Sequence, residues 1–337
     1  MKKLLIILCC CFLGIKSFAQ DIQFSQFYAS PLYLNPAFAG STDYSRVGVN
    51  YRNQWPGLDH SFNSFSAYGD MYIDDKNSGL GIIINGSRES LANLQNMEVG
   101  LLYSYRVRLG AARYLQVGAQ GSFISRSGNF DKIILSSQLD IDRGTIIGGG
   151  NGVAGEPMRR FADLNTGLLY YSEKIWIGAS AHHLTQPNVS FIEGQDRLAI
   201  KYSLHGGIKF DLQPGLINDF VNNTQQERTI SFAFNYKQQG PFDQLNIGTE
   251  FYLEPLVLGL WYRGLPSKNA LPNNEALIGL LGFSFVNGLD IGYSYDFTIS
   301  KLGWGNTGGA HELSMRYLFI TPEELKKKRS VLPSLRF

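Results

Sequence analysis

Residues 289–300 read LDIGYSYDFTIS, and this stretch decides the fold class. Every second side chain is apolar or aromatic, and the members of that face are Leu289, Ile291, Tyr293, Tyr295, Phe297 and Ile299. The other face carries small and acidic residues: Asp290, Gly292, Ser294, Asp296, Thr298 and Ser300. A period of two is typical of a β-strand, and about 9–11 such residues cross a bilayer when the strand is tilted. The stretch therefore predicts a transmembrane strand with one face in lipid and the other toward a polar lumen.

The same alternation recurs along the chain. It predicts about fourteen strands, at 44–54, 61–74, 78–88, 96–109, 112–126, 159–172, 174–184, 199–211, 227–237, 242–253, 255–264, 275–286, 288–300 and 309–319. Strands that close into a barrel leave no edge unpaired in lipid. The predicted fold is therefore an all-β transmembrane antiparallel β-barrel. Twelve or sixteen strands remain open alternatives, because strand ends are uncertain by about 2–4 residues.

The predicted connections alternate in length. Tight turns are predicted at 74–77, 110–111, 172–173, 254–255 and 287–288. Longer connections are predicted at 89–95, 127–158, 185–198, 265–274 and 301–308, while 212–226 is a long link where a tight turn is due. Short turns at one end and long loops at the other are typical of outer-membrane barrels, whose turns face the periplasm. We therefore expect an outer-membrane protein with both chain ends in the periplasm.

A soluble β-sandwich of two domains is the alternative fold. It would cover its apolar faces with a second sheet and would use shorter strands. The polar face here carries charges of both signs, as a lumen would: Glu98, Arg106, Arg108, Asp290, Asp296, Glu312 and Arg316. Aromatic residues near strand ends suit the interfacial girdles of a membrane barrel, and we expect Trp55, Tyr72, Trp176, Tyr252, Trp261 and Tyr262 there. The pattern favours the barrel.

The composition excludes two classes of protein. Aromatic residues make up 13% of the chain and the formal net charge is +2, whereas a disordered chain has few aromatic residues and a high net charge. A nucleic-acid binder normally shows a basic excess, which is absent here. Charged residues make up only 17%, against a usual share of about 25%. Few charges and 37 glycines fit a sheet that meets something apolar on one side.

Residues 1–19, MKKLLIILCCCFLGIKSFA, are predicted to be a signal peptide. A positive start precedes a short apolar core, and Ser17-Phe18-Ala19 is a small-x-small cleavage site, so the exported chain would begin at Gln20. The alternatives are a membrane anchor, for which the run is too short, and a lipoprotein, for which the cysteines come too early. All 3 cysteines lie in this segment, so the exported chain would carry no thiol.

No group of residues stands out as catalytic or metal-binding. His182 and His183 are adjacent on a predicted strand, so alternation would point them to opposite faces. Residues 150–155, GNGVAG, match G-x-G-x-x-G but lie in a predicted loop, without the βαβ unit that a dinucleotide site needs. We therefore expect neither an enzyme nor a cofactor.

Two segments flank the predicted barrel of 44–319. Residues 20–43 contain Pro31 and Pro36 among small polar residues and are predicted to be an irregular periplasmic segment outside the barrel. Residues 320–337 are predicted to be a periplasmic C-terminal tail, with a basic run at Lys326, Lys327, Lys328 and Arg329. That run is either a solvated tail or a docking segment for a partner protein or for phosphates of the inner leaflet.

Several ordered strings of the chain resemble one protein family. They are QDIQFSQFYASPLYLNPAFAG (20–40), YRNQWPG (51–57), SYRVRLG (104–110), FDKIILSSQLD (130–140), AHHLTQP (181–187), LHGGIKF (204–210), IGYSYDFTIS (291–300) and GGAHELSMRYLF (308–319). Together they are similar to the PorP/SprF family of type IX secretion system outer-membrane proteins, from about Gln20 to Phe319. The most specific part is FSQF followed by NPAFAG and RNQW.

The resemblance implies an integral outer-membrane barrel that works with the type IX secretion apparatus. Members assist export or surface attachment of particular cargo proteins, often large adhesins, and some serve gliding motility. The implied partners are a cognate cargo protein, the periplasmic and outer-membrane secretion machinery and outer-membrane lipid, without nucleic acid. A general porin for small solutes, using the polar lumen, is the alternative function.

The N-terminal strings predict a segment that docks a partner or plugs the barrel. Two aromatic anchors flank polar residues in FSQF, and the proline and glycine of NPAFAG fix a turn into the first strand. Alternation points Arg52 into the lumen, where it could anchor this segment through carboxylates. The candidate residues are Phe24, Ser25, Gln26, Phe27, Asn35, Pro36, Phe38, Gly40, Arg52, Gln54 and Trp55. The alternative role for them is only to fold the barrel entrance.

Overall fold

The computed structural model describes residues 21–90, 93–128, 139–140, 145–146, 158–191, 194–212, 228–268, 271–285 and 287–319. Its long strands are β1 (Arg46–Gln54), β2 (Phe62–Ile73), β3 (Ser78–Glu89), β4 (Leu94–Gly110), β5 (Arg113–Ser127), β8 (Met158–Ser172), β9 (Ile175–His182), β10 (Lys201–Asp211), β11 (Arg228–Gln239), β12 (Phe242–Leu253), β13 (Leu256–Lys268), β14 (Leu271–Ser284), β15 (Leu289–Thr298) and β16 (Ala310–Leu318). A short hairpin, β6 (Leu139–Asp140) with β7 (Thr145–Ile146), lies between β5 and β8.

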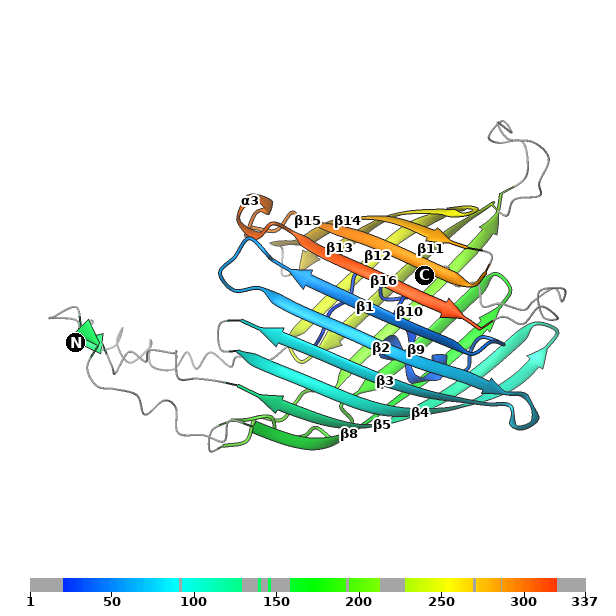
Figure 1. Ribbon diagram of the computed structural model, residues 1–337, viewed down its shortest axis with the longest axis horizontal. Coiled ribbons are helices and arrows are strands. Elements are labelled where there is room, and N and C mark those ends of the chain that lie inside the picture. The colour runs from blue at the N-terminus through cyan, green and yellow to red at the C-terminus, as the bar shows by residue number, and fades with distance from the viewer. Residues whose placement is uncertain are drawn as a thin grey trace.

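The fourteen long strands form one closed antiparallel barrel (Figure 1). Each strand pairs with its neighbours in the chain, and β1 closes the ring against β16 with Arg52 opposite Glu312. The predicted all-β barrel and its strand count are confirmed. The predicted strands fall on the observed ones because each carries the period-two pattern through most of its length.

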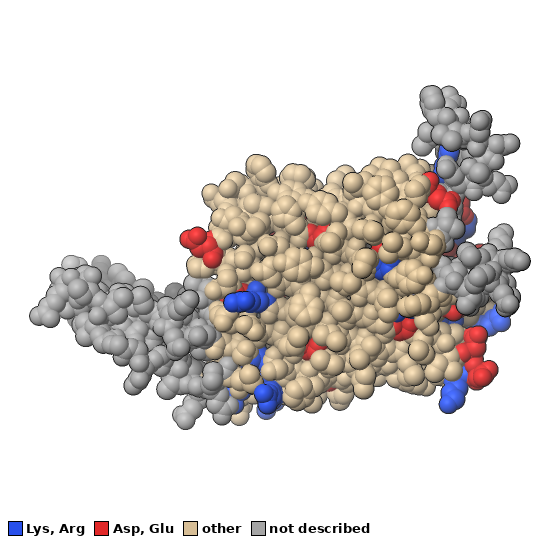
Figure 2. Space-filling view, viewed as in Figure 1, with Lys and Arg blue, Asp and Glu red and all other residues tan. Residues whose placement is uncertain are grey.

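The outer surface of the barrel is apolar. The side chains that alternation points outward are exposed, for example Leu101 at 68% and Leu260 at 62%. Figure 2 shows a barrel wall with few charged residues, whereas projecting Lys, Arg, Asp and Glu side chains gather mainly at the two ends. The inner face holds polar and charged residues instead, such as Ser104, Asn165 and Asp290, all of which are buried. This is the reverse of a soluble protein and suits an apolar solvent outside.

The barrel has two unlike ends. The turn end carries the short connections at 74–77, 111–112, 173–174 and 254–255 and one long connection at 212–227. The long-loop end carries 128–157, 183–200 and 299–309, together with the short turn at 240–241. A short helix, α3 (Trp304–Thr307), lies in the last of these connections. The predicted long connection at 265–274 is wrong, because β13 runs to Lys268 and β14 starts at Leu271, with bulges in their pairing.

Residues 21–43 lie inside the barrel, where Figure 1 draws them in dark blue within the ring of strands. They include α2 (Pro31–Leu34) and η1 (Pro36–Phe38). The prediction that this segment lies outside the barrel is wrong. Its apolar residues Phe27, Leu32 and Phe38 are buried against the inner wall, which removes them from water. None of the helices in the described part of the chain is long and apolar enough to cross a membrane.

Four aromatic residues expected in the interfacial girdles point inward instead. Trp176, Tyr252 and Trp261 are at most 5% exposed and belong to the core around the inner segment. Tyr72 also has inward parity on β2, and its ring lies 3.7 Å from the guanidinium of the buried Arg106. Position near a strand end does not decide the face of a side chain, whereas its parity along the strand does. The three core residues pack inside because the inner segment offers them apolar contacts.

Candidate functional site

The inner segment runs along the barrel from the long-loop end to the turn end. Asp21 contacts Lys201, the first residue of β10, and His183, which directly follows β9, so it lies at the long-loop end. At the other end, the carbonyl of Gly40 accepts a hydrogen bond from Arg106, whose own N–H donates to Asn77 in a turn. The segment therefore passes through the lumen before it enters β1.

One group of charged residues fixes the first part of the segment at the seam where β1 meets β16. This seam cluster is made of Ser25, Arg52, Arg263, Asp296 and Glu312. Arg52 forms ion pairs with Asp296 at 2.8 Å and with Glu312 at 3.2 Å, while Arg263 pairs with Asp296 at 2.7 Å. All four charged residues are buried. Buried charges persist when they are paired and hydrogen-bonded, so the cluster forms one network.

Ser25 and Gln26 connect the backbone of the segment to that network. The carboxylate of Glu312 accepts both backbone N–H groups, from Ser25 at 2.6 Å and from Gln26 at 2.9 Å. The Ser25 hydroxyl donates to Asp296 at 2.8 Å and accepts from Arg52 and Arg263. The Gln26 side chain continues the network through Ser294 and Ser314. The irregular backbone here is thus satisfied by the barrel wall rather than by water.

The middle of the segment lies against inward glycines of the wall. Asn35 accepts from the N–H of Ala37 at 2.8 Å and donates to the carbonyl groups of Leu168 and Ala179. A Cβ on Gly167 would lie 1.8 Å from the Asn35 side chain, and one on Gly118 would lie 2.4 Å from the backbone of Ala37. Only glycine leaves room for so close an approach.

Phe38 and Gly40 anchor the end of the segment. The Phe38 ring packs at 5.8 Å from Trp176 and at 5.9 Å from His205. Gly40 has a φ of +61°, and a Cβ there would lie 2.6 Å from Gly79. Its N–H donates to Asp70, which also pairs with Arg46 at 2.6 Å. Glycine is required at this turn by both backbone and space.

A second charged group holds the segment at the long-loop end. In this mouth cluster Asp21 contacts Lys201 at 2.6 Å and His183 at 2.8 Å. The other ring nitrogen of His183 contacts Asp163 at 2.6 Å. Burial alone would lower the pKa of His183, but the charge of Asp21 and the hydrogen bond to Asp163 outweigh it and raise the pKa to about 9. Although burial opposes ionisation of Asp21, His183 and Lys201 hold its pKa well below the usual value.

His182 and His183 do not point to opposite faces. Both are buried, and their rings lie 6.4 Å apart inside the barrel. The strand ends at His182, and His183 has a φ of +61°, which turns its side chain back toward the lumen. Alternation holds only while the backbone stays extended.

The structure brings most of the predicted residues into contact with one another or with the same wall. Ser25, Gln26 and Arg52 meet in the seam cluster, and Gln54 accepts from Arg52 at 3.3 Å. The second half of the segment contains Asn35, Pro36, Phe38 and Gly40, which are all buried against the inner wall. Phe24 packs on Tyr33, and Phe27 on Trp261. Trp55 lies apart, at the long-loop end beside Phe62, and the basic run of the tail lies outside the described residues.

Sequence reasoning missed Asp21 of the segment itself and several residues of the barrel that hold the segment. They are Asp21, Asp70, Asp163, His183, Lys201 and Arg263. Parity along the strands places most of these side chains on the lumen face, but which charges meet depends on barrel register. In the described ranges, no group of three His, Cys, Asp or Glu is arranged to hold a metal ion.

An apolar outer wall, a polar lumen and a closed antiparallel sheet define a membrane β-barrel with its own chain inside. The model of the PorP/SprF family, described as "Type IX secretion system membrane protein PorP/SprF", matches residues 16–317. The chain therefore belongs to the PorP/SprF family, and the resemblance seen in the sequence is confirmed. Comparison with curated proteins gives no match.

Solved barrels are similar to the chain at low identity. A Pseudomonas aeruginosa FadL homologue is 14% identical, with 86% of this chain and 94% of that one covered and a TM-score of 0.44. A TodX mutant, described as a monoaromatic hydrocarbon channel, is 13% identical, with 88% and 94% covered and a TM-score of 0.41. A Rhodopseudomonas blastica porin mutant is 8% identical, with 82% and 99% covered and a TM-score of 0.33. At these values they say nothing about what this chain binds.

Proposed function

We propose that this chain is an integral outer-membrane barrel that assists type IX secretion by holding a cognate cargo protein. The cargo class would be an adhesin or a gliding-type surface protein, held for export or for surface attachment. Family membership supports the secretion role. The apolar outer wall and the short turns at one end support the outer-membrane location.

The filled lumen is the observation that supports docking of the cargo protein on the barrel over its passage through the barrel. Residues 24–39 are almost all buried inside the barrel. The seam cluster connects Ser25 of this stretch to β1, β13, β15 and β16. A barrel filled by its own chain is a poor conduit for a protein. The cargo is therefore held at an end of the barrel, and no catalytic step is needed.

The two ends suit two partners. We assign the cargo to the long loops at 127–158 and 185–198 and the secretion machinery to the turn end. The same assignment makes residues 1–19 an export signal and residues 320–337 a periplasmic tail, including its basic run. These two segments and most of 127–158 lie outside the described residues.

A deletion strain tests this function. Removing the gene should strip one class of surface protein from the cell, while unrelated outer-membrane proteins stay at their normal level. The wild-type gene should restore the lost surface proteins. A variant with residues 129–157 replaced by a short linker should produce a folded barrel but should not restore those proteins. Heat-dependent gel mobility checks that the variant barrel folds. An unchanged set of surface proteins in the deletion strain would contradict the function.

A further inference from the structure

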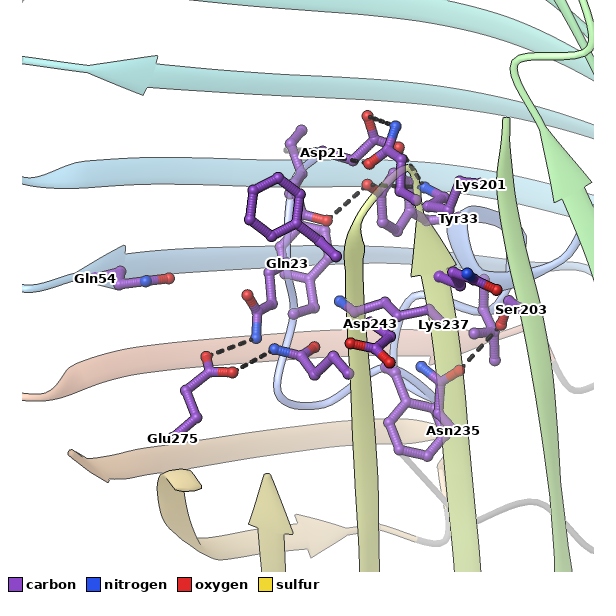
Figure 3. A pocket seen from close by; sticks show the side chains of 18 of the residues that line it. Asp21, Gln23, Tyr33, Gln54, Lys201, Ser203, Asn235, Lys237, Asp243 and Glu275 are labelled. Atoms are coloured by element: carbon purple, nitrogen blue, oxygen red, sulfur yellow. Dashed lines mark hydrogen bonds and ion pairs between the residues drawn. The ribbon is translucent and has the colours of Figure 1, made fainter. Parts of the chain in front are cut away.

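A cavity opens at the long-loop end beside the start of the inner segment. Its volume is about 330 Å³, close to the lower limit of about 300 Å³ for small-ligand sites. Residues 21–24 form one wall, and residues of β1, β10, β11, β12 and β14 contribute to the others. Figure 3 shows this cavity with the side chains of Asp21, Lys237 and Glu275 around it.

The acidic groups of the cavity already have partners. Asp21 is held by Lys201 and His183, as described for the mouth cluster. Glu275 accepts from Gln23 at 3.1 Å and from Gln244 at 2.5 Å, and it forms an ion pair with Arg263 at 3.8 Å. Asp243 is also engaged in an interaction. Within the described ranges, none of these carboxylates lies within ion-pair distance of Lys237.

Lys237 is the cation without a partner. Within the described ranges its ammonium makes no hydrogen bond and no ion pair, although the side chain lines the cavity. Asn235 lies two residues earlier on the same face of β11, and its carbonyl oxygen accepts from Ser203 at 3.0 Å, which leaves its amide nitrogen to donate. Residues two apart on a strand are about 7 Å apart, so both donors reach one small ligand.

The rest of the lining includes large apolar groups. Phe24, Phe27, Leu34 and Phe242 contribute to the cavity together with the polar residues. A partly buried ammonium without a partner can form a charge-assisted hydrogen bond with an anion that enters the cavity. A single cation matches a monoanion such as a carboxylate better than a doubly charged phosphate. The apolar groups match a hydrocarbon or aromatic part next to that carboxylate.

We propose that this cavity binds a carboxylate carried on an apolar or aromatic group. The Lys237 ammonium pairs with the carboxylate, the Asn235 amide donates a further hydrogen bond, and Phe24 and Phe242 contact the apolar part. The carboxylate has two sources, a free small acid or an acidic side chain of a protein that reaches the mouth. The site rests on the unpaired Lys237 ammonium, the free amide nitrogen of Asn235 and the apolar lining of the cavity, and it is independent of the secretion role.

Ligand-observed NMR on the whole exported chain in lipid nanodiscs tests the site. The free-acid probe is 3-phenylpropionate with its neutral amide as comparison, and the peptide probe is acetyl-Phe-Glu-Phe-amide with its Gln counterpart. Wild-type protein should bind the acid about tenfold more tightly than the amide in at least one of the two pairs. Binding in only the first pair indicates a small acid, and binding in only the second indicates a protein side chain.

Three variants separate the site from general attraction of anions. Lys237→Gln should remove the preference for the acid, and Lys237→Arg should keep it because the charge stays. Lys174→Gln, which removes an exposed charge at the turn end, should leave the affinity unchanged. Because Lys237 has no hydrogen-bond or ion-pair partner among the described residues, its replacement removes no such interaction, and heat-dependent gel mobility checks folding. Equal affinity for acid and amide, no binding of either acid, or an intact preference in Lys237→Gln would overturn the site.

Discussion

At the scale of single residues, the inward glycines decide whether the inner segment fits. Gly167→Ala would place a Cβ 1.8 Å from the Asn35 side chain, so either the strand or the segment must shift. We expect the free energy of unfolding to fall by about 1–3 kcal/mol, as overpacking typically costs. Urea unfolding in detergent micelles measures it.

The matched control for this change is Gly121→Ala on β5. Gly121 faces outward, and a Cβ there would meet its nearest neighbour at 4.0 Å. The control should change stability by less than about 0.5 kcal/mol, as surface substitutions usually do. Equal effects of the two substitutions would mean that the segment does not press on β8.

His183 gives the mouth cluster a dependence on pH. Its pKa of about 9 lies above the ordinary value of 6.5, so protonation stabilises the folded state. This stabilisation is complete below about pH 6.5 and is lost as pH rises through about 9. Asp21 and Asp163 face its ring directly, while Lys201 and His182 are the other titratable groups beside it.

We expect wild-type protein to be more stable than His183→Gln by about 1–3 kcal/mol at pH 6. The difference should shrink as the pH approaches 10, because the wild-type ring is then neutral. Unfolding curves of both proteins from pH 6 to pH 10 measure it, and subtraction removes titrations common to both. A difference that stays constant over this range would show that the charge of His183 does not hold Asp21.

At the scale of elements, the inner segment depends on the seam cluster. Arg52→Gln leaves Glu312 without its ion pair and Asp296 with Arg263 alone. Breaking a buried ion pair typically lowers stability by about 3–5 kcal/mol, so the segment should dissociate from the inner wall more often. Arg108→Gln, at an exposed position of β4, is the matched control and should have little effect.

A cysteine inside the segment reports how often it leaves. Ala29 is buried, and the chain beyond residue 19 has no natural cysteine, so Ala29→Cys should react slowly with a water-soluble maleimide. Adding Arg52→Gln should raise that rate at least about tenfold, since a 1.4 kcal/mol loss already gives this factor. Lys174→Cys, on the surface, should react quickly in either background. Equal rates for Ala29→Cys with and without the Arg52→Gln change would contradict the anchoring role.

The strands could be predicted from the sequence, whereas the position of the inner segment could not. The pattern of 289–300 predicts β15 because one face of the strand meets lipid and the other meets a polar interior. These two environments produce an alternation of apolar and polar residues with a period of two. The inner segment has no such period, since its surroundings change at every residue. Ser25 meets Glu312 across 287 positions of the chain, and only the closed barrel brings them together. His183 was misplaced because one positive φ ends the alternation.

For the whole molecule, the filled lumen separates a docking protein from a porin. The purified barrel should show no large steady current in a planar bilayer, because residues 24–39 occupy the lumen. Arg52→Gln should add brief openings, since it frees the segment part of the time, whereas Arg108→Gln should not. A large steady current from the wild-type protein without any partner would favour the porin.

We expect closure of the barrel and binding of the inner segment to its inner wall to be a single cooperative step. The seam cluster joins Ser25 to side chains of β1, β13, β15 and β16, so its partners include the first strand and the last two. Contacts at the start of the chain therefore form only after the last strands are in place. Such distant pairing makes folding slow, and the aromatic residues of the segment stay exposed to solvent until the ring is complete. A chain truncated before β16 would lose closure of the barrel and also Glu312, which holds the inner segment.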